Sequence, residues 1–268
     1  MIVVYLSTSV RHIFSREYNL KLVYVFCFCF CFIFLFPTFA KANEPLRVGL
    51  IEGGRAPYFF AHDNPRTGLY KDLLTAISRL TGVKFSFDYY PQARLRKMMI
   101  SGNLDVEMGT DPLWRQAANE INQSVYSDPF MQSTESWVVA LNNKDRIDTL
   151  IATPGVARPC LVLGFNVETN MKKANDNVKG NSDQHLLNML VRNRCDIALI
   201  PDVILEYYQV VEDKRFVLSP AKNKYQLSIR FGKKHQSFLP KINKALREIK
   251  QSGELQQLMN KYGINHSY

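Results

Sequence analysis

Residues 46–54, LRVGLIEGG, decide how the rest of the chain is interpreted. A short apolar run that ends in an acidic residue and two glycines is typical of a buried strand followed by a turn. An amphipathic helix is expected next, from about Leu69 to a stop at Gly82. Its apolar positions are Leu69, Leu73, Ile77 and Leu80. A strand followed by a helix in this way predicts an α/β fold with mainly parallel sheets.

The same alternation continues along the chain and then starts again as a second, smaller series. Further strands are expected at 83–90, 104–109, 135–141, 160–164, 195–200 and 224–231. Two α/β series joined by two extended segments predict two lobes with a hinge and a ligand cleft between them. We expect lobe 1 to comprise 43–137 plus 230–268, and lobe 2 to comprise 138–229.

The first 42 residues differ from the rest. The run VYVFCFCFCFIFLFPTFA (23–40) follows three basic residues and leads into Ala40-Lys41-Ala42. This order predicts a signal peptide over 1–42, cleavage before Asn43 and a periplasmic location. An uncleaved membrane anchor is the alternative that the length permits.

Charge and motif content exclude several classes of function. The 268-residue chain has a formal net charge of +10, with no Lys/Arg run longer than two, which favours a field that concentrates anions over nucleic-acid binding. No G-x-G-x-x-G follows Gly53-Gly54, and no catalytic Ser/His/Asp arrangement is readable. The histidines considered as metal ligands, His62, His185, His235 and His266, lack metal-ligand spacing. We therefore expect neither a cofactor nor a metal.

Two of the five cysteines, Cys160 and Cys195, lie after the signal segment, each at the start of an expected strand. Those strands should be neighbours in lobe 2, so a disulfide is sterically reasonable in an oxidising compartment. Two buried free thiols remain the alternative.

Short motifs spread over most of the chain point to one family. They are LRVG (46–49), Ala56-Pro57-Tyr58, Gly68 with Asp72, Ser101-Gly102 with Asp105, Thr110 with Arg115, YSDPF (126–130), CDIA (195–198) and Gly253 with Leu255 before Lys261-Tyr262-Gly263. In this order they resemble the bacterial extracellular solute-binding proteins of family 3, the polar-amino-acid receptors of transport systems. The resemblance implies a two-lobed type II periplasmic-binding-protein fold. It also implies a small-molecule ligand that is bound without chemistry, and a membrane permease of an ABC importer or a sensor kinase as partner.

In such receptors an arginine after the third strand binds the ligand carboxylate, and Arg115 holds that position. Asp111-Pro112 predicts a helix start beside it, so Thr110 and free amide groups are expected to converge with Arg115 on an anion. The alternative is a surface arginine stabilised by Glu120. Replacement of Arg115 is expected to weaken binding with little effect on folding.

The part of the pattern that binds an α-ammonium group is altered. The family's aspartate position holds Pro201, and Asp202 comes one residue late; the second-lobe loop has Phe165 and Asn166, and Arg55 lies near the usual aromatic position. The resemblance therefore implies a small carboxylate or other anion, with an α-amino acid possible if Asp202 reaches the cleft.

Four more residues are candidates for the site. Tyr90 and Arg94 lie where the second strand meets its helix, Glu52 follows the first strand, and Glu107 is a carboxylate in an apparently buried strand. An unpaired buried carboxylate is costly, so Glu107 should meet an arginine or face the cleft. Paired carboxylates beside an arginine would also suit a periplasmic dehydratase of cyclic carboxylates, an activity that a few members of this fold have. A receptor without enzymatic activity is the preferred interpretation.

Overall fold

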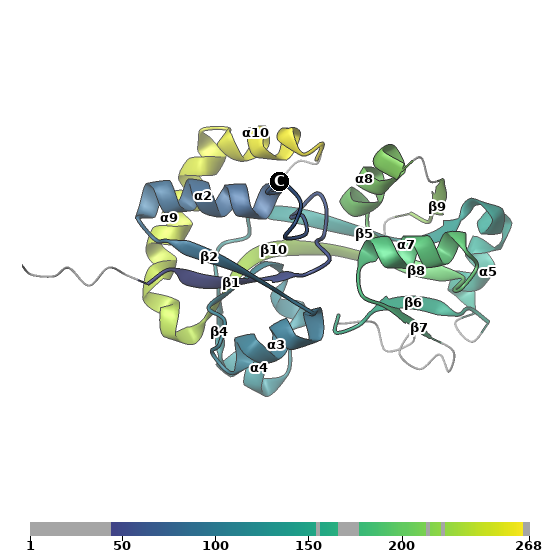
Figure 1. Ribbon diagram of the computed structural model, residues 1–268, viewed down its shortest axis with the longest axis horizontal. Coiled ribbons are helices and arrows are strands. Elements are labelled where there is room, and N and C mark those ends of the chain that lie inside the picture. Colours follow the sequence, from purple (N-terminus) through teal and green to yellow (C-terminus); the bar gives the residue numbers. More distant parts are fainter. Residues whose placement is uncertain (1–43, 154–155, 166–176, 213–214, 221–222, 265–268) are drawn as a thin grey trace, which may run out of the picture. The chain divides into compact units, whose positions relative to one another are not determined.

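The computed structural model describes residues 44–153, 156–165, 177–212, 215–220 and 223–264 (Figure 1). The predicted signal peptide and its cleavage site lie outside these residues. Within the described ranges, no helix combines the length and the apolar character needed to span a membrane.

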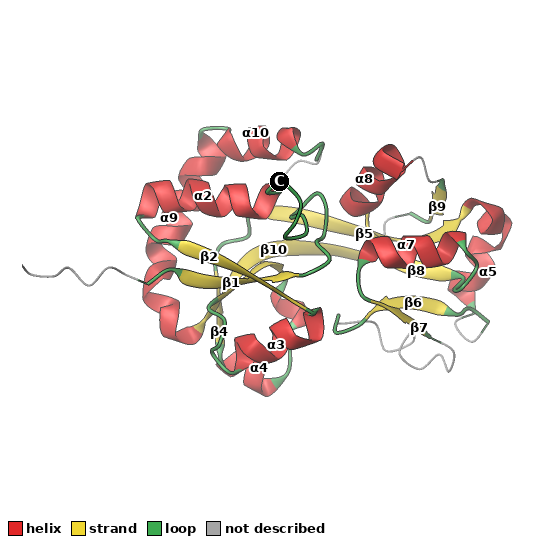
Figure 2. Ribbon diagram, viewed as in Figure 1, coloured by secondary structure: helices red, strands yellow, loops and turns green. Residues whose placement is uncertain are grey.

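The first lobe is built on a parallel sheet in which β1 (Leu46–Ile51) lies between β2 (Phe85–Tyr90) and β3 (Val106–Thr110). Its helices are α2 (Leu69–Thr81), α3 (Gln92–Ile100), α4 (Ala118–Asn122), α9 (Leu239–Gln251) and α10 (Glu254–Lys261), with the 3-10 helices η1 (Pro112–Trp114) and η3 (Lys233–Phe238). Helices α2, α9 and α10 lie together, and α3 and α4 lie on the opposite side of the strands (Figure 2).

The second lobe repeats this plan on a smaller scale. Its parallel strands are β8 (Ile197–Pro201), β6 (Pro159–Val162) and β7 (Val178–Gly180), with β6 in the middle. Its helices are α5 (Ile147–Ala152), α7 (Asp183–Val191) and α8 (Asp202–Glu212), with η2 (Leu141–Arg146) and the short strand β9 (Phe216–Leu218).

Two long strands, β5 (Met131–Ala140) and β10 (Asn223–Gly232), connect the lobes (Figure 1). Residues 228–232 of β10 pair antiparallel with β3 and β4 (Ser124–Tyr126), whereas 223–227 pair antiparallel with β5. Strand β5 in turn pairs with β8 and β9. The hydrogen-bonded order is therefore β2-β1-β3-β10-β5-β8-β6-β7, and the boundaries expected at 137 and 230 fall within β5 and β10.

Helix α2 shows why the sequence folds in this way. Leu69, Leu73 and Ile77 are fully buried, as the helical spacing predicts, whereas the fourth apolar position, Leu80, is 39% exposed in the last turn. Gly82 ends the helix in the left-handed conformation with φ of 69°, which a residue without a Cβ adopts at little cost. The predicted α/β class and two-lobed architecture are therefore confirmed.

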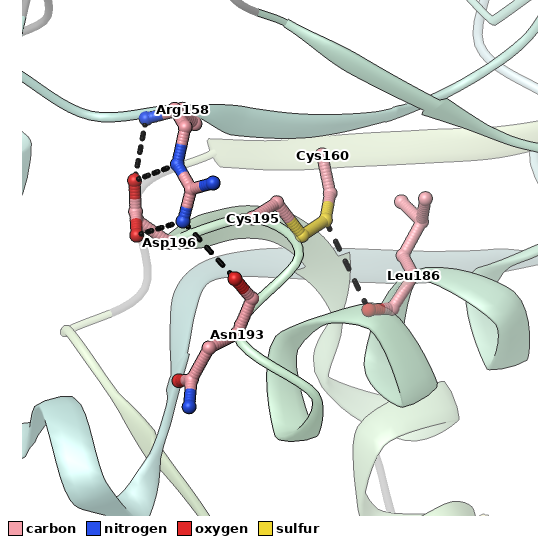
Figure 3. Close-up of a disulfide and its surroundings, with 6 residues drawn as sticks. All are labelled: Arg158, Cys160, Leu186, Asn193, Cys195 and Asp196. Carbon is pink, nitrogen blue, oxygen red and sulfur yellow. Dashed lines mark hydrogen bonds and ion pairs between the residues drawn. A yellow bond between two sulfur atoms is a disulfide. The ribbon is translucent and has the colours of Figure 1, made fainter.

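The structure joins Cys160 and Cys195 in a disulfide, with their Cα atoms 5.7 Å apart (Figure 3). Cys160 lies in β6 and Cys195 just before β8, its parallel neighbour. Arg158 joins the same two strands beside the disulfide. Its backbone N–H and its Nε both donate to Asp196, at 2.9 and 3.0 Å. The bridge therefore ties two strands where an ion pair already aligns them.

Candidate functional site

A cavity of about 360 Å³ is lined by residues from both lobes and from the connecting strands. Its polar and charged lining residues are Arg55, Tyr70, Gln92, Glu107, Thr110, Trp114, Arg115, Glu135, Asp183 and Tyr225. Its apolar lining includes Leu50, Phe59, Leu95, Leu161, Phe165 and Leu199. The volume and the mixture of apolar wall with a few charged groups are typical of a small-molecule site.

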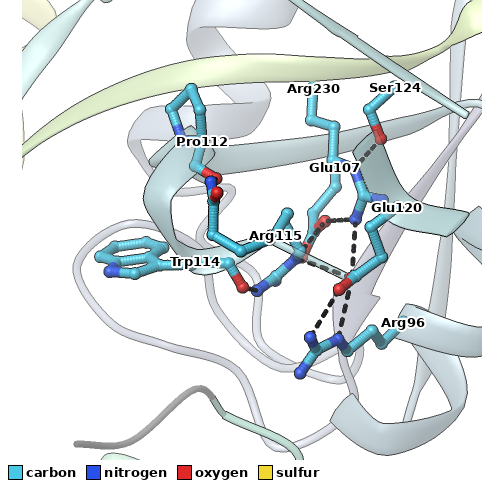
Figure 4. A network of polar contacts seen from close by, with 9 residues as sticks. Arg96, Glu107, Pro112, Trp114, Arg115, Glu120, Ser124 and Arg230 are labelled. Atoms are coloured by element: carbon cyan, nitrogen blue, oxygen red, sulfur yellow. Dashed lines mark hydrogen bonds and ion pairs between the residues drawn. The ribbon is translucent and has the colours of Figure 1, made fainter. Parts of the chain in front are cut away.

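Glu107 is the centre of a charge network on the first-lobe side (Figure 4). Both of its carboxylate oxygens accept hydrogen bonds from Arg115, and Nη1 of Arg230 donates to Oε2 at 2.8 Å. Burial alone would raise the pKa of Glu107, but the charges and hydrogen bonds of Arg115 and Arg230 outweigh it and lower that pKa to about 2. Glu107 therefore both meets an arginine and faces the cavity.

The network continues to Glu120, which is almost completely buried. Arg96 binds both oxygens of Glu120 at 2.9 and 2.6 Å, and Arg115 and Arg230 lie 3.7 and 3.8 Å from Oε1. Three arginines thus face two glutamates, so the network has one positive charge in excess. Nη2 of Arg230 is buried and has no hydrogen-bond partner in the described part of the chain.

Arg115 lines the cavity as expected, but its local structure differs from the prediction. The chain after Asp111 forms the three-residue helix η1, and Arg115 follows as its C-cap. The side chain of Asp111 accepts the N–H of Leu113, and the next two N–H groups donate to the carbonyls of Asp111 and Pro112. The predicted cluster of free amides is therefore wrong, because the turn satisfies them itself. Arg115 is also only 5% exposed and ion-paired, so the expected independence from folding is unsupported.

Arg55 and Asp183 join the two lobes across the cavity. Nε of Arg55, in the β1–α2 loop, lies 2.8 Å from Oδ2 of Asp183, at the start of α7. The guanidinium carbon of Arg55 also lies 4.8 Å from the centre of the Phe165 ring. Both charged side chains are largely buried, so this pair is shielded from water and salt.

Glu135 is the third acidic residue in the cavity wall, after Glu107 and Asp183, and lies on the connecting strand β5. It lies opposite Asn223 of β10, whose side chain hydrogen-bonds with it, and opposite Pro201 of β8. Burial raises the pKa of Glu135 to about 7, and Asp183 acts in the same direction. In contrast to Glu107, Glu135 forms no ion pair with any described lysine or arginine.

The other predicted residues divide into three groups. Thr110 and Phe165 line the cavity together with Arg55 and Arg115. Glu52, Tyr90, Arg94 and Asp202 lie outside its lining, and Asn166 lies outside the described residues. Glu52 is exposed, and Arg94 and Tyr90 contact each other, with the guanidinium carbon of Arg94 4.6 Å from the centre of the Tyr90 ring. Asp202 accepts a hydrogen bond from Thr134 at 2.6 Å. Their roles in binding stay predictions.

Several cavity residues were missed by the sequence analysis. Glu135 lies in the strand expected at 135–141 but was not considered as a site residue. Like Glu107, it is an acidic residue in an expected buried strand, and this feature could have identified it. Asp183 carries no comparable signal, because acidic residues are common in the first turn of a helix. Trp114 and Tyr225 pack edge to face, with ring centres 4.8 Å apart, and the buried hydroxyl of Tyr70 has no hydrogen-bond partner among the described residues.

The described residues contain no group of three or more His, Cys, Asp or Glu side chains that could hold a metal ion. The geometry is that of a cavity between two α/β lobes, with buried charges of both signs. Residues 46–265 match the family described as bacterial extracellular solute-binding proteins, family 3. The chain belongs to this family. The family consists mostly of binding proteins without enzymatic activity, found outside the cytoplasm.

Solved structures show that this fold occurs in other proteins. An ancestral arginine-binding protein bound to arginine is 24% identical, with a TM-score of 0.69, over 83% of this chain and 99% of that one. The ancestral amino acid-binding protein AncCDT-1, a precursor of cyclohexadienyl dehydratase, is 21% identical, with a TM-score of 0.68, over 81% and 95%. A histidine kinase sensor domain with similarity to periplasmic binding proteins is 15% identical, with a TM-score of 0.69, over 83% and 97%. No curated protein sequence matches the chain.

Proposed function

We propose that this family 3 protein is a periplasmic receptor that captures a small carboxylate-bearing metabolite, an amino acid or a related compound. The observation that carries the proposal is the cavity of about 360 Å³ that both lobes line, with Arg115 in its wall. The network around Arg115 has one more positive than negative charge, which favours an anionic group of the ligand at that end. Thr110 and Tyr70 offer hydroxyl groups to the same cavity.

A thermal-shift screen of the chain from Asn43 onward tests this proposal. The probes are amino acids, organic acids, amines and sugars. A probe at a hundred times its dissociation constant stabilises the folded protein by about 2.7 kcal/mol, which is readily measured. We expect stabilisation by at least one carboxylate-bearing probe. Stabilisation by sugars or amines alone would contradict the proposal.

Variants at Arg115 identify the anion-binding group. Arg115→Lys should recover only part of the affinity that Arg115→Ala loses, because an ammonium keeps the charge but not the planar pair of donors. Since Arg115 also pairs with Glu107, each variant needs an unfolding curve, and binding is measured well below the midpoint. Arg79→Ala is the matched control, because Arg79 is an exposed arginine that pairs with Glu254 on the surface. Unchanged affinity in folded Arg115→Ala would remove Arg115 from the site.

The route after capture is import through an ABC permease or signalling through a sensor kinase. Uptake of a radiolabelled hit by cells that lack the gene separates the two. Lost uptake supports import, whereas normal uptake with a lost transcriptional response supports signalling.

One observation favours an enzyme as the second candidate function. A carboxyl group with a pKa of about 7, such as Glu135, can donate or accept a proton at neutral pH, as a dehydratase of cyclic carboxylates requires. Mass spectrometry after overnight incubation with each hit tests this activity. An unchanged mass for every hit would support a receptor and exclude turnover of those compounds.

A further inference from the structure

A second pocket, of about 460 Å³, lies outside the interlobe cavity and shares no lining residue with it. Its first-lobe wall includes Phe60 and Arg66 of the loop between β1 and α2, and Lys261 and Tyr262 at the end of α10. Tyr207 of α8 supplies the second-lobe wall. We call this site the rim pocket. An occupant of the rim pocket would contact both lobes.

Three aromatic rings form the apolar part of the rim pocket. The ring of Phe60 packs against those of Tyr207 and Tyr262, with ring centres 6.0 and 6.3 Å apart. Phe60 is only 4% exposed, whereas Tyr207 and Tyr262 are half-buried, so part of each tyrosine ring is open to solvent. Such rings can pack edge to face or face to face with a further aromatic group.

Arg66 gives the rim pocket a positive charge that no described acidic residue balances. Its guanidinium carbon lies 4.0 Å from the centre of the Phe60 ring and 5.8 Å from that of Tyr207, and Nη2 donates to the Tyr207 hydroxyl at 2.8 Å. Among the described residues, no carboxylate forms an ion pair with Arg66, and no group accepts a hydrogen bond from its Nε or Nη1. The rings therefore position a guanidinium group whose remaining donors suit an anion.

The other basic residue of the rim pocket is neutralised. Nζ of Lys261 lies 2.7 Å from Oδ2 of Asp72, and the hydroxyl of Tyr262 donates to the same oxygen at 2.6 Å. Lys261 and Asp72 thus cancel each other's charge. The net charge that the described residues give the rim pocket is therefore the single positive charge of Arg66.

We propose that the rim pocket is an accessory binding site for a small aromatic carboxylate, with the carboxylate toward Arg66 and the ring beside Phe60, Tyr207 and Tyr262. The charge of Arg66 selects an anion, because a cation would be repelled and a neutral ring would leave the guanidinium group without a counter-charge. The rings select an aromatic body, because a bare anion would leave the apolar wall in water. This site is separate from the receptor cavity and does not rest on the receptor proposal.

Four probes separate the contribution of the charge from that of the ring. Benzoate carries both features, benzyl alcohol lacks the charge, benzylamine reverses it, and acetate lacks the ring. Binding to the chain from Asn43 onward is followed by the backbone amide NMR signals of Thr67 and Tyr262, which lie in the rim pocket. We expect benzoate to shift these signals, and each of the other three probes to bind there at least about tenfold more weakly.

Benzoate can also enter the interlobe cavity, so the site of binding has to be resolved. Occupation of the cavity shifts the amide signals of Gly109 and Thr110, which line it. Shifts confined to those two signals, or equal affinities of benzoate and acetate measured at Thr67 and Tyr262, would overturn the accessory site.

Variants on both sides of the rim pocket test its composition. Arg66→Gln should weaken benzoate binding at Thr67 and Tyr262 about tenfold or more, and Arg66→Lys should recover part of that loss. Arg66→Gln should fold, because Arg66 is exposed and no ion pair is lost. Tyr207→Ala removes the second-lobe wall and should also weaken binding. Arg192→Gln, at an exposed arginine outside both linings, is the matched control and should change nothing.

The accessory site and the receptor proposal fail in different ways. Unchanged affinity for benzoate at Thr67 and Tyr262 in folded Arg66→Gln would overturn the accessory site and leave the receptor standing. Binding of benzoate at the rim pocket, with no carboxylate that binds in the cavity, would support the accessory site and contradict the receptor.

Discussion

In both lobes, an arginine–aspartate pair joins two neighbouring parallel strands where the strands begin. In the first lobe, the backbone N–H and Nε of Arg47 donate to Oδ2 of Asp105, both at 3.0 Å, and the N–H of Asp105 donates to the carbonyl of Arg47 at 2.9 Å. In the second lobe, Arg158 and Asp196 make the same set of contacts. One arginine and one aspartate thus fix the register of neighbouring strands in both lobes.

The residues beside this arginine–aspartate pair differ between the lobes. Two positions after Arg47 is Gly49, and one position before Asp105 is Leu104, which packs against Gly49. The equivalent positions in the second lobe hold Cys160 and Cys195, which form the disulfide. The first lobe has the larger set of helices around its sheet and joins its strands by packing, whereas the smaller lobe uses a covalent bond. The cavity walls differ too, since Glu107 is ion-paired and Glu135 is not.

Among the variants that test this comparison, removal of the charge of Glu107 should lower the free energy of unfolding the most. Glu107→Gln leaves Arg115 and Arg230 with Glu120 alone, so we expect the free energy of unfolding at pH 7 to fall by about 3–5 kcal/mol in urea denaturation. Glu254→Gln, which breaks an exposed pair with Arg79, should cost at most about 1 kcal/mol. Equal costs in the two variants would contradict the network.

The disulfide should account for the next largest effect, in the second lobe. Thiol titration of the unreduced, denatured chain from Asn43 should find no free thiol, and two free thiols would refute the bridge. It closes a loop with a sequence separation of 35 residues. Its reduction should therefore lower the free energy of unfolding by about 3–4 kcal/mol on the chain-entropy account. Cys160→Ser/Cys195→Ser, measured without reductant, should lose a similar amount.

The two cavity glutamates should give opposite dependences of stability on pH. The pKa of Glu135 is raised from the ordinary 4.5 to about 7, so the folded state binds the proton more tightly. Its stabilisation is present below pH 4.5 and is lost as the pH rises to 7, by about 3 kcal/mol. The pKa of Glu107 is lowered to about 2, so its stabilisation is present above pH 4.5 and is lost as the pH falls.

Unfolding curves from pH 3 to 8 for the parent and both Gln variants measure these terms by difference. Asp183, Asp202 and Arg55 are the other charged groups that act on Glu135, and all three are present in the parent and in both variants. Glu135→Gln should flatten the loss between pH 4.5 and 7. A parallel curve for Glu135→Gln and the parent would contradict the raised pKa.

Gly49→Ala should have the smallest effect of the four. A Cβ there would lie 2.5 Å from Cδ1 of Leu104 and 2.7 Å from Cδ2 of Leu95, so both side chains must move, at about 1–3 kcal/mol. Gly49→Ala with Leu104→Ala should recover part of the loss if the clash with Leu104 is its cause. No loss in Gly49→Ala would show that the first lobe tolerates a side chain at the position that Cys160 holds in the second.

The sequence predicted the helix at α2 and the strand at β1 because burial requires an apolar side chain at each inward position, and that periodicity is visible in one dimension. It failed at Asp111-Pro112, where the same two residues suit the start of an α-helix or a single 3-10 turn. The backbone N–H of Gln226 in β10 donates to the Asp111 side chain and so joins this turn to the sheet. The residues around Asp111 do not predict that long-range contact.

The candidate site was predicted in part. Thr110, Arg115, Arg55 and Phe165 line the cavity because the order of strands and loops places the ends of both sheets together. The partner of each charge could not be predicted, since Arg115 and Glu107 are eight residues apart whereas Arg230 comes from the other end of the chain. Glu135 was missed because its burial depends on β8 and β10 on either side.

The sequence by itself therefore determined the class of fold, the two lobes and the family, since these depend on periodicity and on the order of short motifs. Only the tertiary structure decided which charges cancel and which remain. Arg55 pairs with Asp183, and Glu107 pairs with Arg115 and Arg230. In each case the fold brings side chains from separate elements within 4 Å of each other. An ionic interaction depends on distance and burial, and neither is a property of sequence separation.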